Sequence, residues 1–136
     1  MKTYLNEITI TSHSENQGYT TSSTGFKVPI KDATHQTDGT SAGELVAMSL
    51  ATCLHATLHV LMKAKRLTLE SRIDVRYRSY KEDTPSLGFY FELLATIHLP
   101  GLNDDDAQAL VSRTKELCPV SKMLTQYPHV SIELKT

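Results

Sequence analysis

Two stretches in the middle of the chain alternate between apolar and polar residues. In residues 69–79 most odd positions are apolar and every even position from 70 to 78 is charged, while in residues 87–99 every odd position is apolar. A period of two places alternate side chains on opposite faces of a strand, one toward a core and one toward water. The segment "KEDTPS" between them contains turn-forming residues, so we expect an antiparallel hairpin of two long strands.

The run "LVAMSLATCLHATLHVLM", residues 45–62, has no formal charge over 18 residues. It follows Ser41-Ala-Gly-Glu44, which has the S-x-x-E spacing of a capping box, and basic residues follow its end. These signals predict a helix over about 42–66. The run is at the lower limit for crossing a membrane, contains His, Ser and Thr, and lacks flanking aromatic residues, so we expect a buried core helix instead.

Shorter patterns predict the remaining elements. An alternating segment from Tyr4 to Thr11 indicates a first strand, and the segment around Pro29 indicates a further strand at a sheet edge. Asn103 caps a second helix, and "CPVSKML" breaks and restarts it because proline suits a first helical turn. A last strand lies at 130–134. The order β-β-(β)-α-β-β-α-α-β predicts an α+β fold in a single domain over residues 1–136.

A helix that is apolar on all sides raises a burial problem. One sheet face and one amphipathic helix cannot cover every side of it in a chain of this size. We therefore expect a symmetric homodimer in which this helix is covered by both subunits.

Composition narrows the class of function. Hydrophobic residues make up 40% and charged residues 21% of the chain, the net charge is −1, and no basic block is present. These values are typical of a globular protein and disfavour nucleic acid and anionic membranes as partners. The first residues lack the apolar core of a signal peptide, so we expect a cytoplasmic protein. In a reducing compartment its two cysteines are reactive or inert thiols more often than a structural disulfide.

The two cysteines differ in their surroundings. Cys53 lies in the middle of the predicted long helix among small residues, where a free cysteine commonly acts as a small hydrophobic residue. Cys118 precedes Pro119 at the start of a short helix, where backbone N–H groups lower the pKa of a thiol. Cys118 is accordingly either a reactive thiol or a residue that only caps and packs at a helix break.

Other candidate residues have simpler explanations. His55 and His59 share one helix face, but no third ligand is evident, so interface polar groups are favoured over a metal site. The arginines of strand 72–78 are solvated or, alternatively, supply a cation to a thiolate. Glu44 lies nine residues before Cys53, about 13.5 Å and half a turn away in a regular helix, so a capping role suits it better than a catalytic one.

The segments "GELVAMSLATCLHATL" and, about 65 residues later, "CPVSKML" resemble the OsmC/Ohr family, named for osmotic induction and organic hydroperoxide resistance. The resemblance covers nearly the whole chain. It implies an intertwined homodimer, active sites at the subunit interface, and thiol-dependent peroxidase chemistry without a cofactor or metal. It also implies that Cys53 is the peroxidatic residue and Cys118 the resolving residue.

Two positions depart from the peroxidases of that family. Those enzymes carry an arginine in the N-terminal hairpin, whereas this chain has "HSENQGYTT" there, with Asn16 near the place of the arginine. They also carry a glutamate ten residues before the peroxidatic cysteine, whereas this chain has Gly43 at that position. Lys27 or an arginine of strand 72–78 are the candidate substitutes for the missing cation. The sequence pattern is more similar to the OsmC-like branches whose substrates are unclear.

Three functions therefore remain open. The first is a peroxidase that reduces organic hydroperoxides and is regenerated by an external dithiol, with Cys53, Cys118 and, more weakly, Glu44 as its site residues. The second is a non-enzymatic dimer that binds a small apolar ligand at the subunit interface. The third is a metal-dependent role through His55 and His59.

Overall fold

The computed structural model describes residues 3–14, 18–31, 39–83 and 88–135. The chain divides into two compact units, Met1–Ala42 and Gly43–Thr136. The assignment of the whole chain to a single domain stays a prediction.

The N-terminal unit contains a small antiparallel sheet with strands in the order β1-β2-β3. These strands are β1 (Ile10–His13), β2 (Tyr19–Ser22) and β3 (Lys27–Pro29). Pro29 lies on an edge strand, as predicted, because a residue without an N–H group cannot donate to a neighbour on both sides. The predicted first strand begins later than expected, since residues 3–9 form no strand.

The C-terminal unit pairs a three-stranded sheet with three helices. Its elements in chain order are α1 (Ala42–Ala64, beginning one residue before the unit boundary), β4 (Arg72–Lys81), β5 (Phe89–His98), α2 (Asp104–Leu117), α3 (Pro119–Leu124) and β6 (Val130–Leu134). β4 runs antiparallel to β5 with Arg72 opposite His98, and β6 runs parallel to β5. The hairpin, the helix break and the last strand are confirmed, and the α+β class with them.

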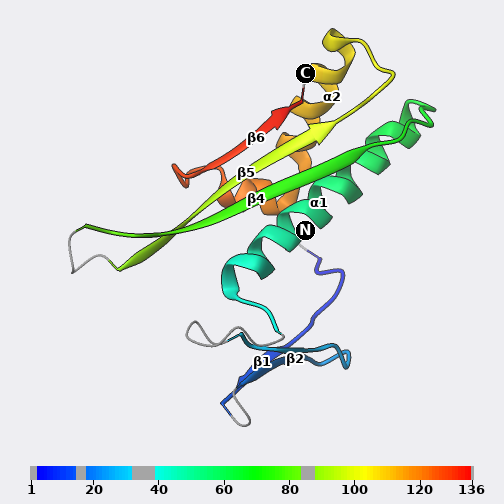
Figure 1. Ribbon diagram of the computed structural model, residues 1–136. Helices are drawn as coiled ribbons and strands as arrows, with labels where there is room; N and C mark the ends of the chain where they lie inside the picture. Colours follow the sequence, from blue (N-terminus) through cyan, green and yellow to red (C-terminus); the bar gives the residue numbers. More distant parts are fainter. Residues whose placement is uncertain (1–2, 15–17, 32–38, 84–87, 136) are drawn as a thin grey trace. The chain divides into compact units, whose positions relative to one another are not determined.

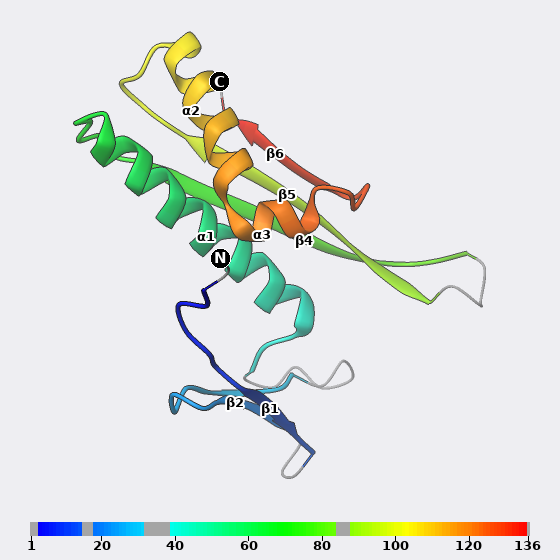
Figure 2. The same cartoon turned by 180° about the vertical axis from the view of Figure 1, so that it is seen from behind.

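The three helices cover one face of this sheet, and the other face is free of helices (Figures 1 and 2). The alternation along β4 explains which face is covered. Ile73, Val75 and Tyr77 pack against the core, while the even residues from Arg72 to Arg78 are exposed on what we term the outer face. β4 begins at Arg72 rather than near residue 69, but the predicted assignment of its two faces is correct.

The core between the sheet and the helices consists of two hydrophobic clusters. The aliphatic cluster lies under α2 and contains Leu58, Met62, Ile97, Leu99, Ala107, Leu110 and Val111. The thiol cluster lies nearer the start of α1 and contains Ala47, Leu50, Leu54, Leu93, Ala95 and Cys118, with Cys53 packed against it. Partly buried Ile73 and Ile132 contact both clusters, so the core is continuous.

Helix α1 contributes one face to this core. Its buried residues, Gly43, Ala47, Leu50, Leu54, Leu58 and Met62, recur at intervals of three or four. The opposite face is exposed and mixes large apolar residues, such as Met48 (61% accessible) and Val60 (66% accessible), with uncharged polar residues and histidines. A single chain therefore does not bury the helix on all sides, as expected from its sequence. Among the described residues, α1 is also the one helix long and apolar enough to cross a membrane by length and composition.

Candidate functional site

The two cysteines lie side by side within one chain. Cys53 is in the middle of α1 at the border between its buried and exposed faces, and it is half-buried. Cys118 lies between α2 and α3 and is fully buried, with 0% of its surface accessible. Cys53 packs against the cluster that contains Cys118, and the two thiols are close enough to interact electrostatically. The fold thus brings together two thiols that are 65 residues apart in the sequence.

Cys118 belongs to both of the helices that flank it. Its backbone N–H donates to the carbonyl of Thr114 at 2.9 Å and ends α2. Its sulfur accepts a hydrogen bond from the backbone N–H of Ser121 at 3.4 Å, and so it caps the first turn of α3. Pro119 takes the first position of α3, which needs no N–H donor. The backbone on both sides therefore holds the Cys118 sulfur in place.

The pKa of the Cys118 thiol is raised above its ordinary value. Burial is the largest cause, and the hydrogen bond with Cys53 raises the pKa further by favouring the protonated form. The backbone N–H groups of Ser121 and Val120 act in the opposite direction but do not reverse the shift. The expectation that the helix N-terminus lowers this pKa is therefore wrong, because desolvation outweighs two backbone donors at a buried sulfur.

Glu44 lies in the first turn of α1 and is half-buried. Because α1 is continuous from Ala42 to Ala64, nine residues of helix separate Glu44 from Cys53. That spacing corresponds to about 13.5 Å and places the two side chains on opposite sides of the helix. The structure does not bring Glu44 to the thiol pair of its own chain.

Gly43 has a structural role that the sequence did not reveal. It is buried, and a Cβ atom at this position would overlap the ring of Tyr77. Tyr77 comes from β4, packs against the thiol cluster and meets Phe91 edge to face, with ring centroids 5.4 Å apart. The side chain that related peroxidases carry at this position would therefore have to displace Tyr77.

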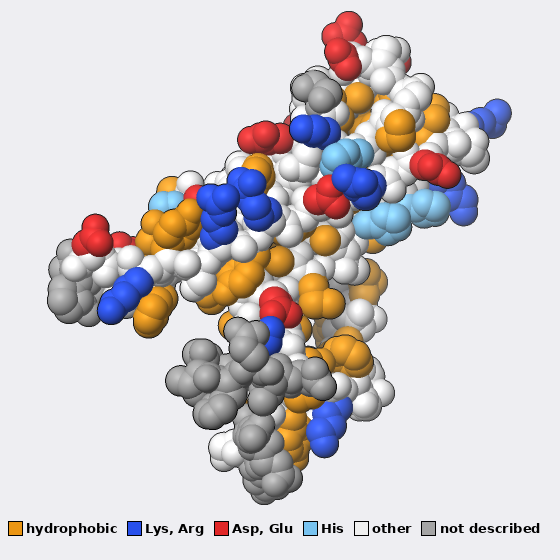
Figure 3. All heavy atoms as spheres, in the orientation of Figure 1, with side chains coloured by type: hydrophobic (Ala, Val, Ile, Leu, Met, Phe, Trp, Pro, Cys, Tyr) orange, Lys and Arg blue, Asp and Glu red, His pale blue; other side chains and the backbone are white. Residues whose placement is uncertain are grey.

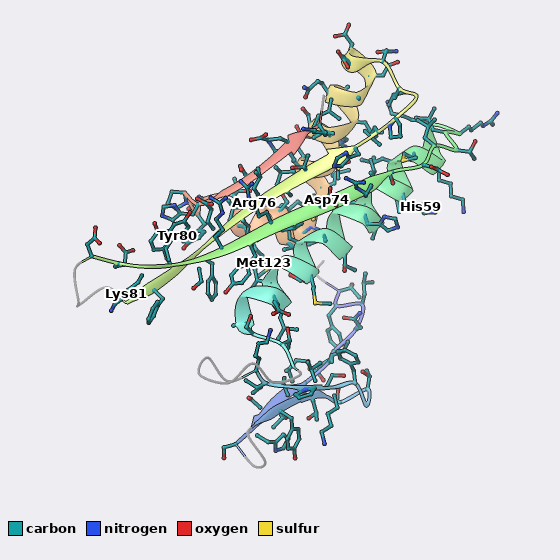
Figure 4. All side chains as sticks on the ribbon, in the orientation of Figure 1. His59, Asp74, Arg76, Tyr80, Lys81 and Met123 are labelled. Atoms are coloured by element: carbon teal, nitrogen blue, oxygen red, sulfur yellow. The ribbon has the colours of Figure 1, made fainter. Side chains whose placement is uncertain are left out.

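The arginines of β4, proposed as substitutes for the missing arginine, lie on the face of the sheet opposite the thiols. The arginines of β4 lie on the outer face, where charged and histidine side chains gather (Figure 3). Figure 4 labels Asp74 and Arg76 along this strand. Arg72 donates to Asp74 at 2.9 Å, and Arg78 lies 3.9 Å from Glu92. These arginines therefore belong to a surface charge network on the side of the sheet away from α1.

The remaining candidates belong to the N-terminal unit, to the exposed part of α1 or to residues outside the described part of the chain. Lys27, in the N-terminal unit, places its ammonium 4.2 Å from the centre of the Tyr19 ring. Asn16 is outside the described residues. His55 and His59 stack on the exposed part of α1 with centroids 6.4 Å apart. In the described part of the chain, no group of three or more His, Cys, Asp or Glu side chains could hold a metal ion.

The family model for OsmC-like proteins matches residues 33–133, which include both cysteines and all of the C-terminal sheet except its last residue. The chain belongs to the OsmC-like family. The resemblance of the cysteine motifs is thereby confirmed at the level of the family.

Individual relatives support the same assignment over nearly the full chain. The organic hydroperoxide resistance protein OhrB of Bacillus subtilis is 26% identical over 130 residues, which are 93% of this chain and 95% of that protein. The crystal structure of OhrB has a TM-score of 0.83 and covers 97% of this chain and 100% of its own. A presumed redox protein of Lactobacillus casei is 27% identical with a TM-score of 0.88, over 98% of this chain and 93% of its own.

These OsmC-like structures establish the fold and the place of α1 in it. Their fold is that of soluble proteins, so the chain is a non-membrane protein and α1 is a core helix.

Sequence reasoning missed Tyr77 and the backbone N–H of Ser121. Tyr77 stands at a core-facing position of an alternating strand, which was a signal for burial but not for contact with Gly43. For the Ser121 N–H, the available signal was its position three residues after the cysteine that precedes the helix.

Proposed function

We propose that this protein is a cysteine-based peroxidase that reduces organic hydroperoxides in oxidative-stress defence. The observation that carries the proposal is that Cys53 and Cys118 lie together in one core cluster of an OsmC-like protein and interact with each other. The name of the similar OhrB protein supports organic hydroperoxides as the substrate class.

The difference in burial supports distinct roles for the two thiols. Cys53 is half-buried and lies at the edge of the exposed face of α1, where a substrate can approach it. Cys118 is fully buried and keeps its proton because its pKa is raised. A peroxidatic residue must meet the substrate as a thiolate, while a resolving residue needs only to lie beside it. Cys53 is therefore the peroxidatic residue and Cys118 the resolving one.

The proposed reaction has three steps. The Cys53 thiolate attacks the outer oxygen of the hydroperoxide, the O–O bond breaks, and the alcohol leaves after taking up a proton, which leaves a sulfenic acid on Cys53. The Cys118 thiol attacks that sulfur, forming a disulfide and releasing water. An external dithiol reduces the disulfide and is itself oxidised to a disulfide. The aliphatic side chains around Cys53 favour an organic substrate over hydrogen peroxide.

The exposed face of α1 supports the homodimer. Its large residues include Leu45, Met48 and Val60, and small residues such as Ala56 lie between them. An apolar helix face of this kind in a charge-poor segment is typical of a subunit interface. We infer that a second copy of the chain covers it, in the cytoplasm, and completes the substrate pocket beside Cys53. Light scattering at micromolar concentration is expected to give the mass of a dimer, and a cooperatively folded monomer would contradict this.

Single-turnover consumption of cumene hydroperoxide tests the chemistry. Wild type is expected to consume one equivalent per thiol pair, Cys53→Ser to consume none, and Cys118→Ser to consume one equivalent while stopping at the sulfenic acid. The turnover should be slower than in family members with an N-terminal arginine, because a cation near a thiol lowers its pKa by about one to three units and the segment "HSENQGYTT" contains no arginine. If Cys53→Ser consumes hydroperoxide as wild type does, the second function, a dimer that binds a small apolar ligand, replaces the enzyme.

A further inference from the structure

Helix α3 depends on the sulfur that the proposed reaction oxidises. It is only six residues long, and Cys118 supplies its N-terminal cap through the bond from the Ser121 N–H. The carbonyl of Cys118 also accepts the N–H of Lys122 at 2.9 Å. Two hydrogen bonds of the first turn therefore converge on one residue.

Disulfide formation changes this cap in a predictable direction. Both cysteines are free in this structure, so their sulfurs are at non-bonded separation, whereas the sulfurs of a disulfide are about 2.05 Å apart. Cys53 is held within the 23-residue helix α1, so we assign the movement chiefly to the Cys118 sulfur, whose 3.4 Å contact with the Ser121 N–H is then lost. Sulfur is a weak hydrogen-bond acceptor even in a thiol, and the N–H contact at 3.4 Å leaves little room for further stretching.

The packing of α3 offers little resistance to such a movement. Ser121 is its one fully buried residue, Val120 and Leu124 pack against the thiol cluster with only partial burial, and Met123 is 80% exposed. A cavity of about 300 Å³ lies between α3 and β6, lined by Lys115, Ser121, Leu124, Thr125, Val130, Ser131 and Ile132. Helix α2, by contrast, buries four residues in the core. The short helix thus has fewer buried side chains than α2 and has space beside it.

We propose that formation of the Cys53–Cys118 disulfide releases the first turn of α3, and that this released turn admits an external dithiol to the disulfide. The release of the first turn of α3 requires only the two thiols, whereas the admission of a dithiol rests on the proposed peroxidase function. In the reduced state Cys118 is fully covered, so a reductant that attacks its sulfur needs such an opening. A dithiol thiolate then bonds to the Cys118 sulfur, Cys53 leaves as a thiolate, and the second thiol of the reductant closes its own disulfide and frees Cys118.

Hydrogen–deuterium exchange on the reduced and oxidised protein tests the release. Diamide serves as the oxidant, because it takes two electrons and two protons from the thiol pair and becomes a hydrazine, without any need for peroxidase activity. Loss of an N-cap predicts about 2-fold to 30-fold faster exchange at Ser121 and Lys122 on oxidation. The amide of Asp106 is an internal control, since Asn103 caps it at 2.9 Å with an oxygen atom. Cys53→Ser treated with diamide should show no change.

The outcomes separate this inference from the proposed function. Unchanged or slower exchange at Ser121 in a protein whose mass confirms the disulfide overturns the release, and so does failure of diamide to form the disulfide. If diamide forms the disulfide but the protein consumes no hydroperoxide, the proposed peroxidase function is wrong. The release of α3 is still supported in that case if exchange at Ser121 becomes faster on oxidation.

A pair of glycine variants tests the admission of the dithiol. Lys122→Gly weakens α3 at an exposed position, and Gln108→Gly makes the same kind of change at an exposed position of α2. A glycine inside a helix shifts the equilibrium between the formed and the opened helix about fivefold toward the opened form. Reduction of the disulfide by dithiothreitol should therefore be about fivefold faster in Lys122→Gly and unchanged in Gln108→Gly. Equal reduction rates in wild type and Lys122→Gly overturn the idea that α3 controls access.

Discussion

The aliphatic cluster and the thiol cluster are built on the same helix and the same sheet but differ in what covers them. Helix α2 is 14 residues long and supplies three buried side chains to the first, while α3 is six residues long and has one buried side chain beside the second. The aliphatic cluster contains no titratable group among its buried residues, and the thiol cluster contains Cys118.

This difference separates stability from chemistry within one core. Burial of aliphatic side chains is the main source of folding free energy, so a long amphipathic helix over the aliphatic cluster stabilises the whole unit. A reacting thiol pair needs access for a substrate and a reductant, which a thin cover permits. Regions that open locally are those with few buried contacts, and α3 fits that description.

The largest expected effect comes from the aliphatic cluster. Leu110→Ala removes a side chain that is 2% exposed and leaves a cavity, so the free energy of unfolding should fall by about 2–5 kcal/mol. Urea denaturation measures this, with Gln108→Ala on the exposed side of the same helix as the control. The rate of disulfide formation in folded molecules should stay unchanged. A loss similar to that of the control would show that α2 does not anchor the core.

Gly43→Ala tests the tight contact at the thiol cluster. Alanine favours a helix, but its methyl group overlaps the Tyr77 ring, and overpacking of this kind costs about 1–3 kcal/mol. Thermal unfolding should therefore show a destabilised variant, and Tyr77→Leu in the same chain should recover part of the loss. A Gly43→Ala protein at least as stable as wild type would mean that Tyr77 is free to move aside.

The raised pKa of Cys118 predicts a loss of stability at alkaline pH. The folded protein holds this proton more tightly than the unfolded chain does, so stability is complete below the ordinary thiol pKa of 9.0. Above that value the unfolded chain loses the proton first, and stability falls as the pH rises toward the folded pKa. Urea midpoints between pH 7 and pH 10 under reducing conditions should decline more steeply in wild type than in Cys118→Ala. Parallel profiles would show that the thiol is not held in its protonated form.

The smallest effect is expected on the outer face of the sheet. The hydrogen bonds from Arg72 chiefly, and from His98, hold the pKa of Asp74 below its ordinary value of 3.8 against a smaller opposing effect of burial. This contribution to stability is present above pH 3.8 and is lost as the pH falls through the lower folded pKa. Asp74→Asn should therefore flatten the acid limb of the stability profile slightly, while Glu70→Gln should not. Exposure and salt screening keep the effect small, and identical acid limbs in wild type and Asp74→Asn would contradict it.

The sequence by itself determined the elements that depend on neighbouring residues. The alternation in residues 69–79 and 87–99 predicted the hairpin and its two faces, because side-chain direction in a strand follows from position alone. Asn103 predicted the start of α2, where its side chain accepts the Asp106 N–H as expected. Pro119 predicted the restart at α3 for the same local reason.

The tertiary structure alone decided what depends on distant residues. The contact between Cys53 and Cys118 requires α1 and the α2–α3 junction to meet, which no spacing in the sequence reveals and which only the family resemblance implied. The direction of the Cys118 pKa shift depends on burial by side chains from other elements, so the local helix signal gave the wrong sign. The requirement for glycine at position 43 likewise comes from Tyr77 across the core. Local patterns determine backbone geometry, whereas the reactivity of a thiol depends on the solvent and dipoles that folding places around it.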